Sequence, residues 1–173
     1  MPLAVTHVIL TIIIVDLLRD YVIKKHKRYI TLHTLFIAGI GGILPDIDIA
    51  LGWLYSLITG TNTSFHGGFT HTPLFGLIFL IPGLILWYKG KHRYATYFFV
   101  LTFGVLFHIS LDLILGGGAY EGIMLFWPIS TATFKIHLLK MVGVVGIPSA
   151  IDGIILLLWL WHEEYKHKIS DFI

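Results

Sequence analysis

Long apolar stretches alternate with short basic ones along the chain, a pattern typical of membrane-spanning helices. A helix needs about 20 consecutive, mostly apolar residues to cross the hydrocarbon core of a bilayer. Stretches that approach this length predict an all-α transmembrane bundle that forms a single domain, 1–173. We expect about five transmembrane helices, near residues 2–21, 29–44, 73–88, 96–115 and 141–161, with loops at 45–72 and 116–140.

Three of these helices carry features that need an explanation. Helix 29–44 is short for a span, so it is tilted, sunk against its neighbours or extended by the apolar stretch Ile49 to Ile58. In the first helix we expect Asp16 to pair with Arg19 near the inner surface. Asp152, buried in the last helix, is interpreted as a helix-packing hydrogen bonder, with a proton relay as the alternative.

Composition supports a membrane protein. The 173 residues are 56% hydrophobic and 13% charged, against roughly 45–50% and about 25% in soluble domains. A soluble domain of this length could not hide so much apolar surface in one core. The formal charge of +2 gives no expectation of a nucleic-acid partner, and membrane lipids are the expected partners.

The basic residues are divided very unevenly between the two ends of the predicted helices. If successive helices alternate in direction, ten of the twelve Lys and Arg residues lie on one side, and only Lys135 and Lys140 lie on the other. Loops rich in Lys and Arg stay on the cytoplasmic side of a membrane. We therefore expect a multi-pass protein of the cell membrane with its basic loops in the cytoplasm.

Histidine and aspartate side chains that could bind a metal gather on the opposite, extracytoplasmic face. Lys and Arg alone fix the orientation, so this gathering is an independent observation. Because the chain has no cysteine, its metal ligands would be nitrogen and oxygen atoms. The candidate ligands are His7, Asp46, Asp48, His66, His71, His108 and Asp112.

The sequence His108-Ile-Ser-Leu-Asp112 is the sharpest of the motifs. Residues four apart on a helix lie on the same face, one turn from each other. An imidazole and a carboxylate placed in this way can bind one divalent cation. The alternative is a hydrogen-bonded His–Asp pair at a helix end, but ionisable groups inside an apolar helix are costly and usually functional.

The sequence His66-Gly-Gly-Phe-Thr-His71 brings two further histidines close together in the chain. In a helix they would diverge by about 140°, so a shared ligand site requires a bend, which Gly67 and Gly68 permit. Thr72-Pro73 reads as the N-cap and first residue of the next helix, which places His71 just outside it. The alternative is a pair of solvated loop histidines.

Asp46 and Asp48 follow Pro45, where the second helix is expected to end. An Asp after Pro is commonly a turn or N-cap residue, and two carboxylates two residues apart converge only in an extended turn. His7 taken alone is more typical of an interfacial histidine than of a ligand. These three residues become metal-ligand candidates through their position beside the others.

The order and spacing of these motifs resemble one known family. The motifs Thr6-His7, Gly42-Ile-Leu-Pro45-Asp46-Ile-Asp48, His66-Gly-Gly-Phe-Thr-His71, His108-Ile-Ser-Leu-Asp112 and Trp127-Pro128 resemble the YdjM-like (LexA-regulated) membrane-bound metal-dependent hydrolases. That family is distantly similar to zinc-dependent phospholipase C and the P1-type nucleases. The resemblance covers roughly residues 1 to 130 and implies a phosphoester hydrolase with one or more divalent metals, zinc being favoured.

The chain departs from the family at one position. An arginine commonly follows the first of the paired histidines, and here Gly67 takes its place. Arg is well suited to bind a phosphate with two hydrogen bonds. Lys135, His137 or Lys140 from the outer loop could substitute for it.

The mechanism expected from these residues is hydrolysis at the outer membrane–water boundary by a metal-activated water molecule. Asp48 and Glu121 are the candidate general bases, and a lipid phosphoester is the favoured substrate because headgroups lie at this boundary. Two other functions stay open. An ion or metal transporter would place its ligands near the midplane, and a structural metal site would leave no open coordination position for water.

Overall fold

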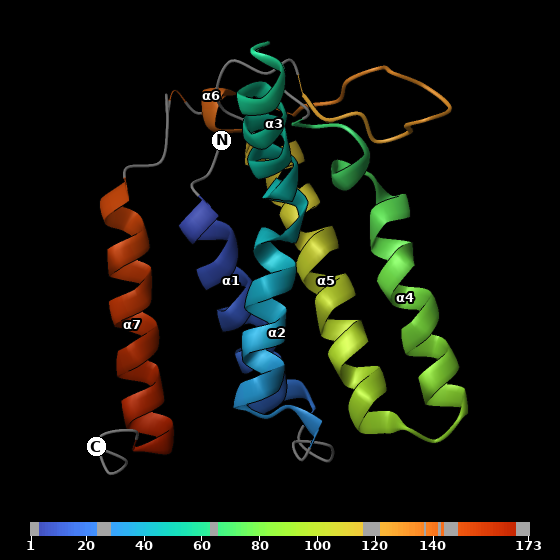
Figure 1. The fold of residues 1–173 in the computed structure, drawn as a ribbon. Helices are drawn as coiled ribbons and strands as arrows, with labels where there is room; N and C mark the ends of the chain where they lie inside the picture. The colour runs from blue at the N-terminus through green and yellow to red at the C-terminus, as the bar shows by residue number, and fades with distance from the viewer. Residues whose placement is uncertain are drawn as a thin grey trace.

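The structure is a computed structural model that describes residues 4–23, 29–62, 66–115, 122–136, 138–141, 143 and 149–168. Within these residues the fold is helical, with one isolated β-bridge between Ile123 and Phe134, and the predicted all-α class is confirmed. The helices are α1 Ala4–Leu17, η1 Leu18–Val22, α2 Leu32–Ile43, η3 Leu44–Asp46, α3 Ile47–Thr59, η4 Phe69–His71, α4 Pro73–Tyr88, α5 His92–Leu115, α6 Leu138–Met141 and α7 Ser149–His167. Helices α1, α2, α4, α5 and α7 run side by side along one axis (Figure 1).

Glycines bring α2 very close to its two neighbours at the level of the site. A Cβ atom on Gly104 of α5 would lie 2.7 Å from the backbone oxygen of Ala38 in α2. A Cβ on Gly42 would lie 2.9 Å from the backbone oxygen of His7 in α1. Small residues allow this kind of close backbone approach between membrane helices. The α1–α2–α5 contact therefore fixes the relative positions of His7, Gly42 and the helix that carries His108.

Helix starts follow from local sequence. At the start of α2, Thr31 and Thr34 form a reciprocal capping box. Thr72 caps α4 by accepting a hydrogen bond from the backbone N–H of Phe75, and Pro73 occupies the first helical position. Pro suits that position because its missing N–H would be unpaired there anyway.

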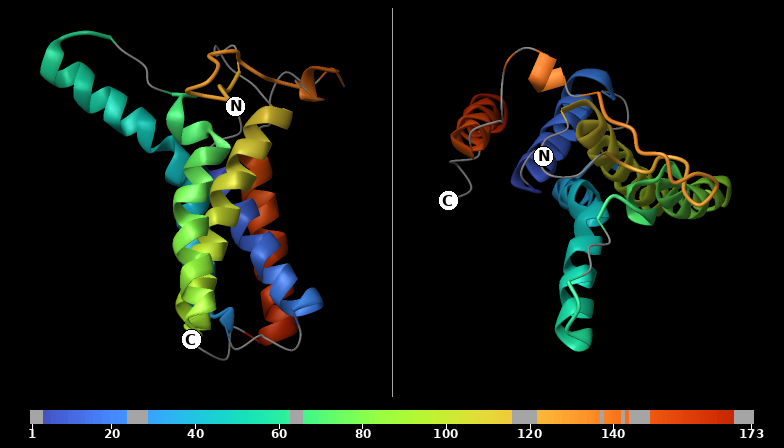
Figure 2. Two further views of the ribbon diagram at one scale, coloured as in Figure 1. Left: turned by 90° about the vertical axis from the view of Figure 1, so that its right-hand side faces the viewer. Right: turned by 90° about the horizontal axis from the view of Figure 1, so that it is seen from above.

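The segment 45–72, expected as a loop, contains a helix. Of the three explanations for the short second helix, extension matches the structure: α2 passes through the 3₁₀ turn η3 into α3, and Leu32–Thr59 forms one apolar helical stretch. Pro45 sits in η3, where its missing N–H interrupts regular helical hydrogen bonding. Beyond this turn α3 leaves the bundle and projects sideways (Figure 2).

Two helical stretches among the described residues are long and apolar enough to cross a membrane, Leu32–Thr59 and His92–Leu115. Pro73–Tyr88 is apolar but shorter. The five-span arrangement and its orientation stay predictions.

Helix α7 contacts α1 and η1 through polar groups at both ends. Thr6 donates a 2.8 Å hydrogen bond to Asp152, which confirms the interpretation of Asp152 as a helix-packing residue. In the lower half, the indole N–H of Trp159 donates to Asp16. The predicted pair of Asp16 with Arg19 is confirmed, with a guanidinium–carboxylate distance of 2.6 Å.

A network of charged groups joins the lower ends of these helices. Arg19 also contacts Asp20 at 3.1 Å, and His167 of α7 lies 2.8 Å from the other oxygen of Asp20. Glu163 lies 3.9 Å from Arg19. Asp16, Asp20 and Glu163 are all buried, so Arg19 supplies the cation that three buried acids share.

Candidate metal centre

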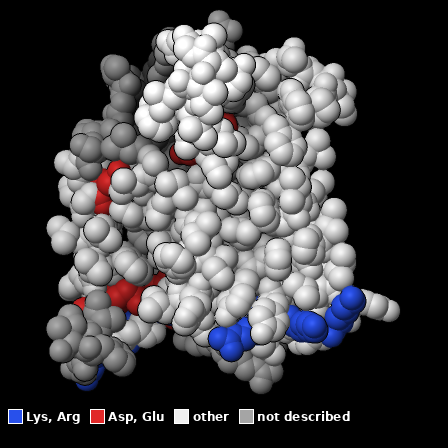
Figure 3. Space-filling model, viewed as in Figure 1, with Lys and Arg blue, Asp and Glu red and all other residues white. Residues whose placement is uncertain are grey.

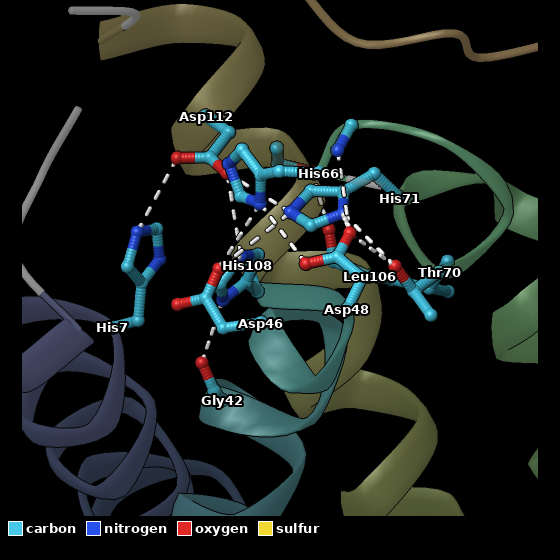
Figure 4. Close-up of polar contacts among 12 residues, drawn as sticks. His7, Gly42, Asp46, Asp48, His66, Thr70, His71, Leu106, His108 and Asp112 are labelled. Atoms are coloured by element: carbon cyan, nitrogen blue, oxygen red, sulfur yellow. Dashed lines mark hydrogen bonds and ion pairs between the residues drawn. The ribbon is translucent and has the colours of Figure 1, made fainter. Parts of the chain in front are cut away.

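All seven predicted ligand residues meet in one cluster at the end of the bundle where α3 begins (Figure 4). The side chains come from α1, η3, α3, η4 with the turn before it, and α5. Most of these side chains are almost fully buried, and Asp46 is the most exposed at 14%. The members are His7, Asp46, Asp48, His66, His71, His108 and Asp112.

His108 is held in a single orientation by the backbone of α2. Its Nδ1–H donates a 2.7 Å hydrogen bond to the carbonyl oxygen of Gly42, which can only accept. This bond leaves Nε2 as the ring nitrogen with a lone pair for a metal, and metal-binding histidines usually donate their other ring N–H to a carbonyl or carboxylate in this way. Nε2 points at Asp112, 3.3 Å away, and at Asp46, 3.5 Å away.

Asp48 faces donors on both of its oxygens. Its Oδ1 lies 3.1 Å from Nδ1 of His66, and its Oδ2 lies 3.1 Å from Nδ1 of His71. Oδ2 also accepts hydrogen bonds from the hydroxyl of Thr70 at 2.7 Å and the backbone N–H of Gly67 at 3.3 Å. The arrangement assigns Asp48 to orienting the two histidines, and it directs Nε2 of His71 toward Asp46 and Asp112.

The distances inside the cluster fit ligands of a shared cation. Asp112 lies 3.4 Å from His7, 3.5 Å from His71 and 3.3 Å from His108. Hydrogen bonds between nitrogen and oxygen are shorter, about 2.7–3.2 Å. Ligands about 2.0–2.1 Å from a tetrahedral zinc ion would be separated by about 3.3–3.4 Å.

The inward-facing atoms have no hydrogen-bond partner, although they are buried. These atoms are Oδ1 of Asp46, Nε2 of His71, Nε2 of His108 and both carboxylate oxygens of Asp112. Buried polar atoms are rarely left without a partner, and an ion is one of the usual reasons. Within this cluster, two groups of three residues have ligand atoms within 4.8 Å of one another: His7, His108 and Asp112, and Asp46, His66 and His71. The donor set therefore fits one or two divalent cations.

The charge of the cluster also requires a cation. With its histidines neutral, the cluster contains three carboxylates, and the ion pairs described for them are all with histidine. Buried carboxylates need a compensating cation or proton. Burial lowers the pKa of His71, but the adjacent carboxylates of Asp112 and Asp48 outweigh burial and raise it above its ordinary value. A proton on His71 is thus the competitor of a metal ion.

Gly67 has a structural role in the turn that carries His66. Its φ of +83° is in the left-handed region, which glycine adopts without strain. Its carbonyl oxygen accepts a hydrogen bond from Met124, so the 122–136 segment is attached directly to the His66 turn. An arginine here, as the family commonly has, would require a different backbone conformation or strain.

Some predicted residues are not placed in the cluster, and some contributors were not predicted. Glu121, His137 and the side chain of Lys140 lie outside the described residues. Thr70 and the carbonyl of Gly42 also support the site; both lie inside the quoted motifs, but the sequence assigned them no role. Thr70 lies between the paired histidines, which is the only hint that the sequence contains.

The fold and the cluster define a helical membrane protein with a buried His/Asp centre. The family model of the YdjM inner membrane protein matches residues 1–168, so the chain belongs to this family. The resemblance inferred from the motifs is thereby confirmed for the family and extends over almost the whole chain. No curated protein and no solved structure gives a significant match, and the likeness to phospholipase C and P1 nucleases stays a prediction.

Proposed function

We propose that this protein is a membrane-embedded metal-dependent hydrolase that cleaves a phosphoester, with a lipid phosphoester as the favoured substrate. The observation that carries the proposal is the set of buried nitrogen and oxygen atoms that lack hydrogen bonds and converge at ligand separations. Zinc is the favoured ion because imidazole and carboxylate ligands at these separations suit it.

His7, His108 and Asp112 would hold one ion, and Asp46, His66 and His71 a second. A divalent ion in such a site supplies Lewis acidity and makes a water molecule acidic enough to act as a nucleophile near neutral pH. The carboxylates of Asp46 and Asp112 lie between the two groups, with Asp46 3.5 Å from His108 and Asp112 3.5 Å from His71.

Of the two general bases predicted from the sequence, the structure describes Asp48 and not Glu121. Asp48 faces four donors, which favours a fixed negative charge that orients the histidines over a proton-accepting role. Glu121 lies outside the described residues. Asp46 is the most exposed carboxylate of the cluster, and its described contacts with His66, His71 and His108 all involve Oδ1. We therefore propose that Oδ1 binds the ion and that the other oxygen, Oδ2, receives the proton of the attacking water.

Charge separation along the bundle supports an extracytoplasmic site. Lysine and arginine side chains line the end of the bundle opposite α3 (Figure 3), and the α4–α5 turn there contains Lys89, Lys91 and Arg93. By the positive-inside rule that end faces the cytoplasm. The metal centre then lies at the outer boundary of the inner membrane, at the depth of lipid headgroups.

Transport is the less favoured alternative. Transporter sites lie near the middle of the bilayer, whereas these ligands are grouped at one end of the bundle (Figures 1 and 4). Asp152, the residue that best suited a relay, is hydrogen-bonded to Thr6. Hydrolytic activity of the metal-loaded protein distinguishes a catalytic metal site from a purely structural one.

The test is release of phosphate or headgroups from inner-membrane lipids in detergent micelles by the purified, zinc-loaded protein. We expect a chelator to abolish this release and added zinc to restore it. Asp46→Asn should reduce the rate of release by at least about 100-fold, the lower range for a general base. Asp152→Asn is the matched control, because Asp152 is a buried carboxylate whose described contact is with Thr6 and with none of the seven cluster residues. A zinc-loaded protein that releases nothing from these lipids would contradict the proposal.

A further inference from the structure

Helix α3 is the most apolar unpartnered element of the described structure. Among its side chains Trp53 is 67% exposed, Leu57 62% and Ile58 77%, and only Asp48 and Gly52 are buried. From Ile49 to Tyr88 the sequence contains no Asp, Glu, Lys or Arg. A helix that is apolar on every side is normally buried in protein or in a membrane. In this family of inner membrane proteins, the bilayer is the medium that can cover it.

The same helix begins inside the metal centre. Asp46 is its N-cap residue, and Asp48 lies in its first turn. Acidic side chains are visible at the molecular surface directly below the overhang that α3 forms (Figure 3). Asp46, with 14% of its side chain exposed, is the member of the cluster most open to the outside. The opening of the centre therefore lies beside the root of α3, on an apolar flank of the molecule.

The length of α3 is also suitable for contact with lipid chains. Its 13 residues extend about 20 Å at 1.5 Å per residue, and they project sideways from the bundle (Figure 2). Gly60, with a φ of +69°, ends the helix in the left-handed conformation typical of a C-cap. The arm is thus a complete helix with defined ends.

We propose that α3 is a membrane-embedded arm that binds the acyl chains of a phospholipid whose phosphate group lies at the metal centre. The substrate then enters sideways from the outer leaflet, beneath α3, instead of from the aqueous phase. This proposal rests on the proposed function for its chemistry. Its binding component can be tested in a protein that has no measurable hydrolytic activity.

The test uses the full-length protein in nanodiscs that contain phosphatidylglycerol with a photoactivatable diazirine in one acyl chain. After illumination, peptide mass spectrometry measures labelling of α3 and, as an internal reference, of the exposed face of α4. Zinc-loaded protein is compared with the same protein after chelation, so that the result does not depend on the folding of a variant. We expect the surrounding lipid to label α3 in both states, and labelling of α3 to be stronger with zinc, which holds a phosphate group beside the helix, while labelling of α4 stays constant. Unlabelled α3, or labelling that is equal with and without metal, would overturn the proposal.

A second measurement compares long-chain and short-chain phosphatidylglycerol as substrates. The Trp53→Gln/Ile58→Gln variant should hydrolyse the long-chain lipid about tenfold more slowly, the ratio expected for loss of one well-buried apolar contact, with the short-chain rate unchanged. The matched control, Trp161→Gln/Tyr165→Gln, removes equally exposed aromatic side chains at the far end of α7. The proposed lipid-binding role of α3 is contradicted if the control variant slows hydrolysis as much as the α3 variant. It is also contradicted if the α3 variant slows hydrolysis of both lipids equally. Absence of all hydrolysis contradicts the proposed function alone, and the labelling experiment then decides the present proposal.

Discussion

The orienting role assigned to Asp48 gives a prediction about metal affinity. In Asp48→Asn, one carboxylate oxygen becomes an amide N–H₂ group that can only donate. Placing the amide nitrogen at the Oδ2 position would bring it against the donors of Gly67 and Thr70. The nitrogen is therefore expected at the Oδ1 position, where it faces Nδ1 of His66, 3.1 Å away in the native protein.

His66 then has to rotate or to move its proton to the other ring nitrogen, and either change alters the ligand atom that it presents. Losing the partner that orients a metal-binding histidine typically costs 10–100-fold in affinity, about 1.4–2.7 kcal/mol. We expect a loss in this range for Asp48→Asn. Because His7, His108 and Asp112 do not contact Asp48, their group of ligands should keep its ion.

The assay is competition for zinc between the purified protein and a fluorescent chelator, with Asp152→Asn as the control for loss of a buried carboxylate. Affinity within a factor of two of the native value would refute an orienting role for Asp48. Loss of binding as complete as in a His108→Ala/Asp112→Ala variant would instead make Asp48 a direct ligand.

Three further predictions concern packing, pH and the inner network. Gly104→Ala places a Cβ 2.7 Å from the backbone oxygen of Ala38 and should lower the free energy of unfolding in detergent by about 1–3 kcal/mol, as measured by denaturant unfolding. The control Gly153→Ala, whose Cβ meets nothing within 4 Å, should leave the free energy of unfolding unchanged. Because protons compete for His71, whose pKa is raised, zinc affinity should fall as pH is lowered from 8 to 5, and a pH-independent affinity measured by chelator competition would contradict this. Arg19→Gln leaves Asp16 and Asp20 buried without their cation and should cost about 3 kcal/mol in unfolding with zinc content unchanged; unaltered stability would contradict the importance of the network.

The membership of the cluster was predictable from sequence because each part of it left a local signal. His108 and Asp112 are one helical turn apart, and Thr72-Pro73 marks the helix start that places His71 at its edge. The topology predicted from the Lys and Arg residues already placed the separate motifs on one face of the membrane. Sequence spacing therefore identified the members of the cluster.

The roles within the cluster could not be predicted, because they depend on contacts between distant segments. Asp48 looked like a ligand or a base, and only its position beside His66, Thr70 and His71 shows how its oxygens are engaged. The helix α3 was predicted only as one of three explanations for the short second helix, namely its extension by the apolar stretch Ile49 to Ile58. Pro45 and two aspartates are typical of a turn, so the sequence did not decide among these explanations.

The inner network also depends on distant contacts. The pair of Asp16 and Arg19 followed from their spacing of three residues, but His167 is 147 positions from Asp20 along the chain. The π-helical turn η1 ends α1 in this region, and no composition rule predicts such a turn. Long-range pairing of α1 with α7 was therefore outside the reach of the sequence.

The metal content of the purified protein tests the central claim most directly. The protein is purified in detergent without chelator, and metals per chain are measured beside the His108→Ala/Asp112→Ala variant. We predict at least one equivalent of zinc or another divalent ion in the native protein, rising to two when both ligand groups are filled. The variant should lose the ion held by His7, His108 and Asp112, so it should bind about one equivalent less than the native protein. A native protein that holds no metal even after incubation with zinc would contradict the account.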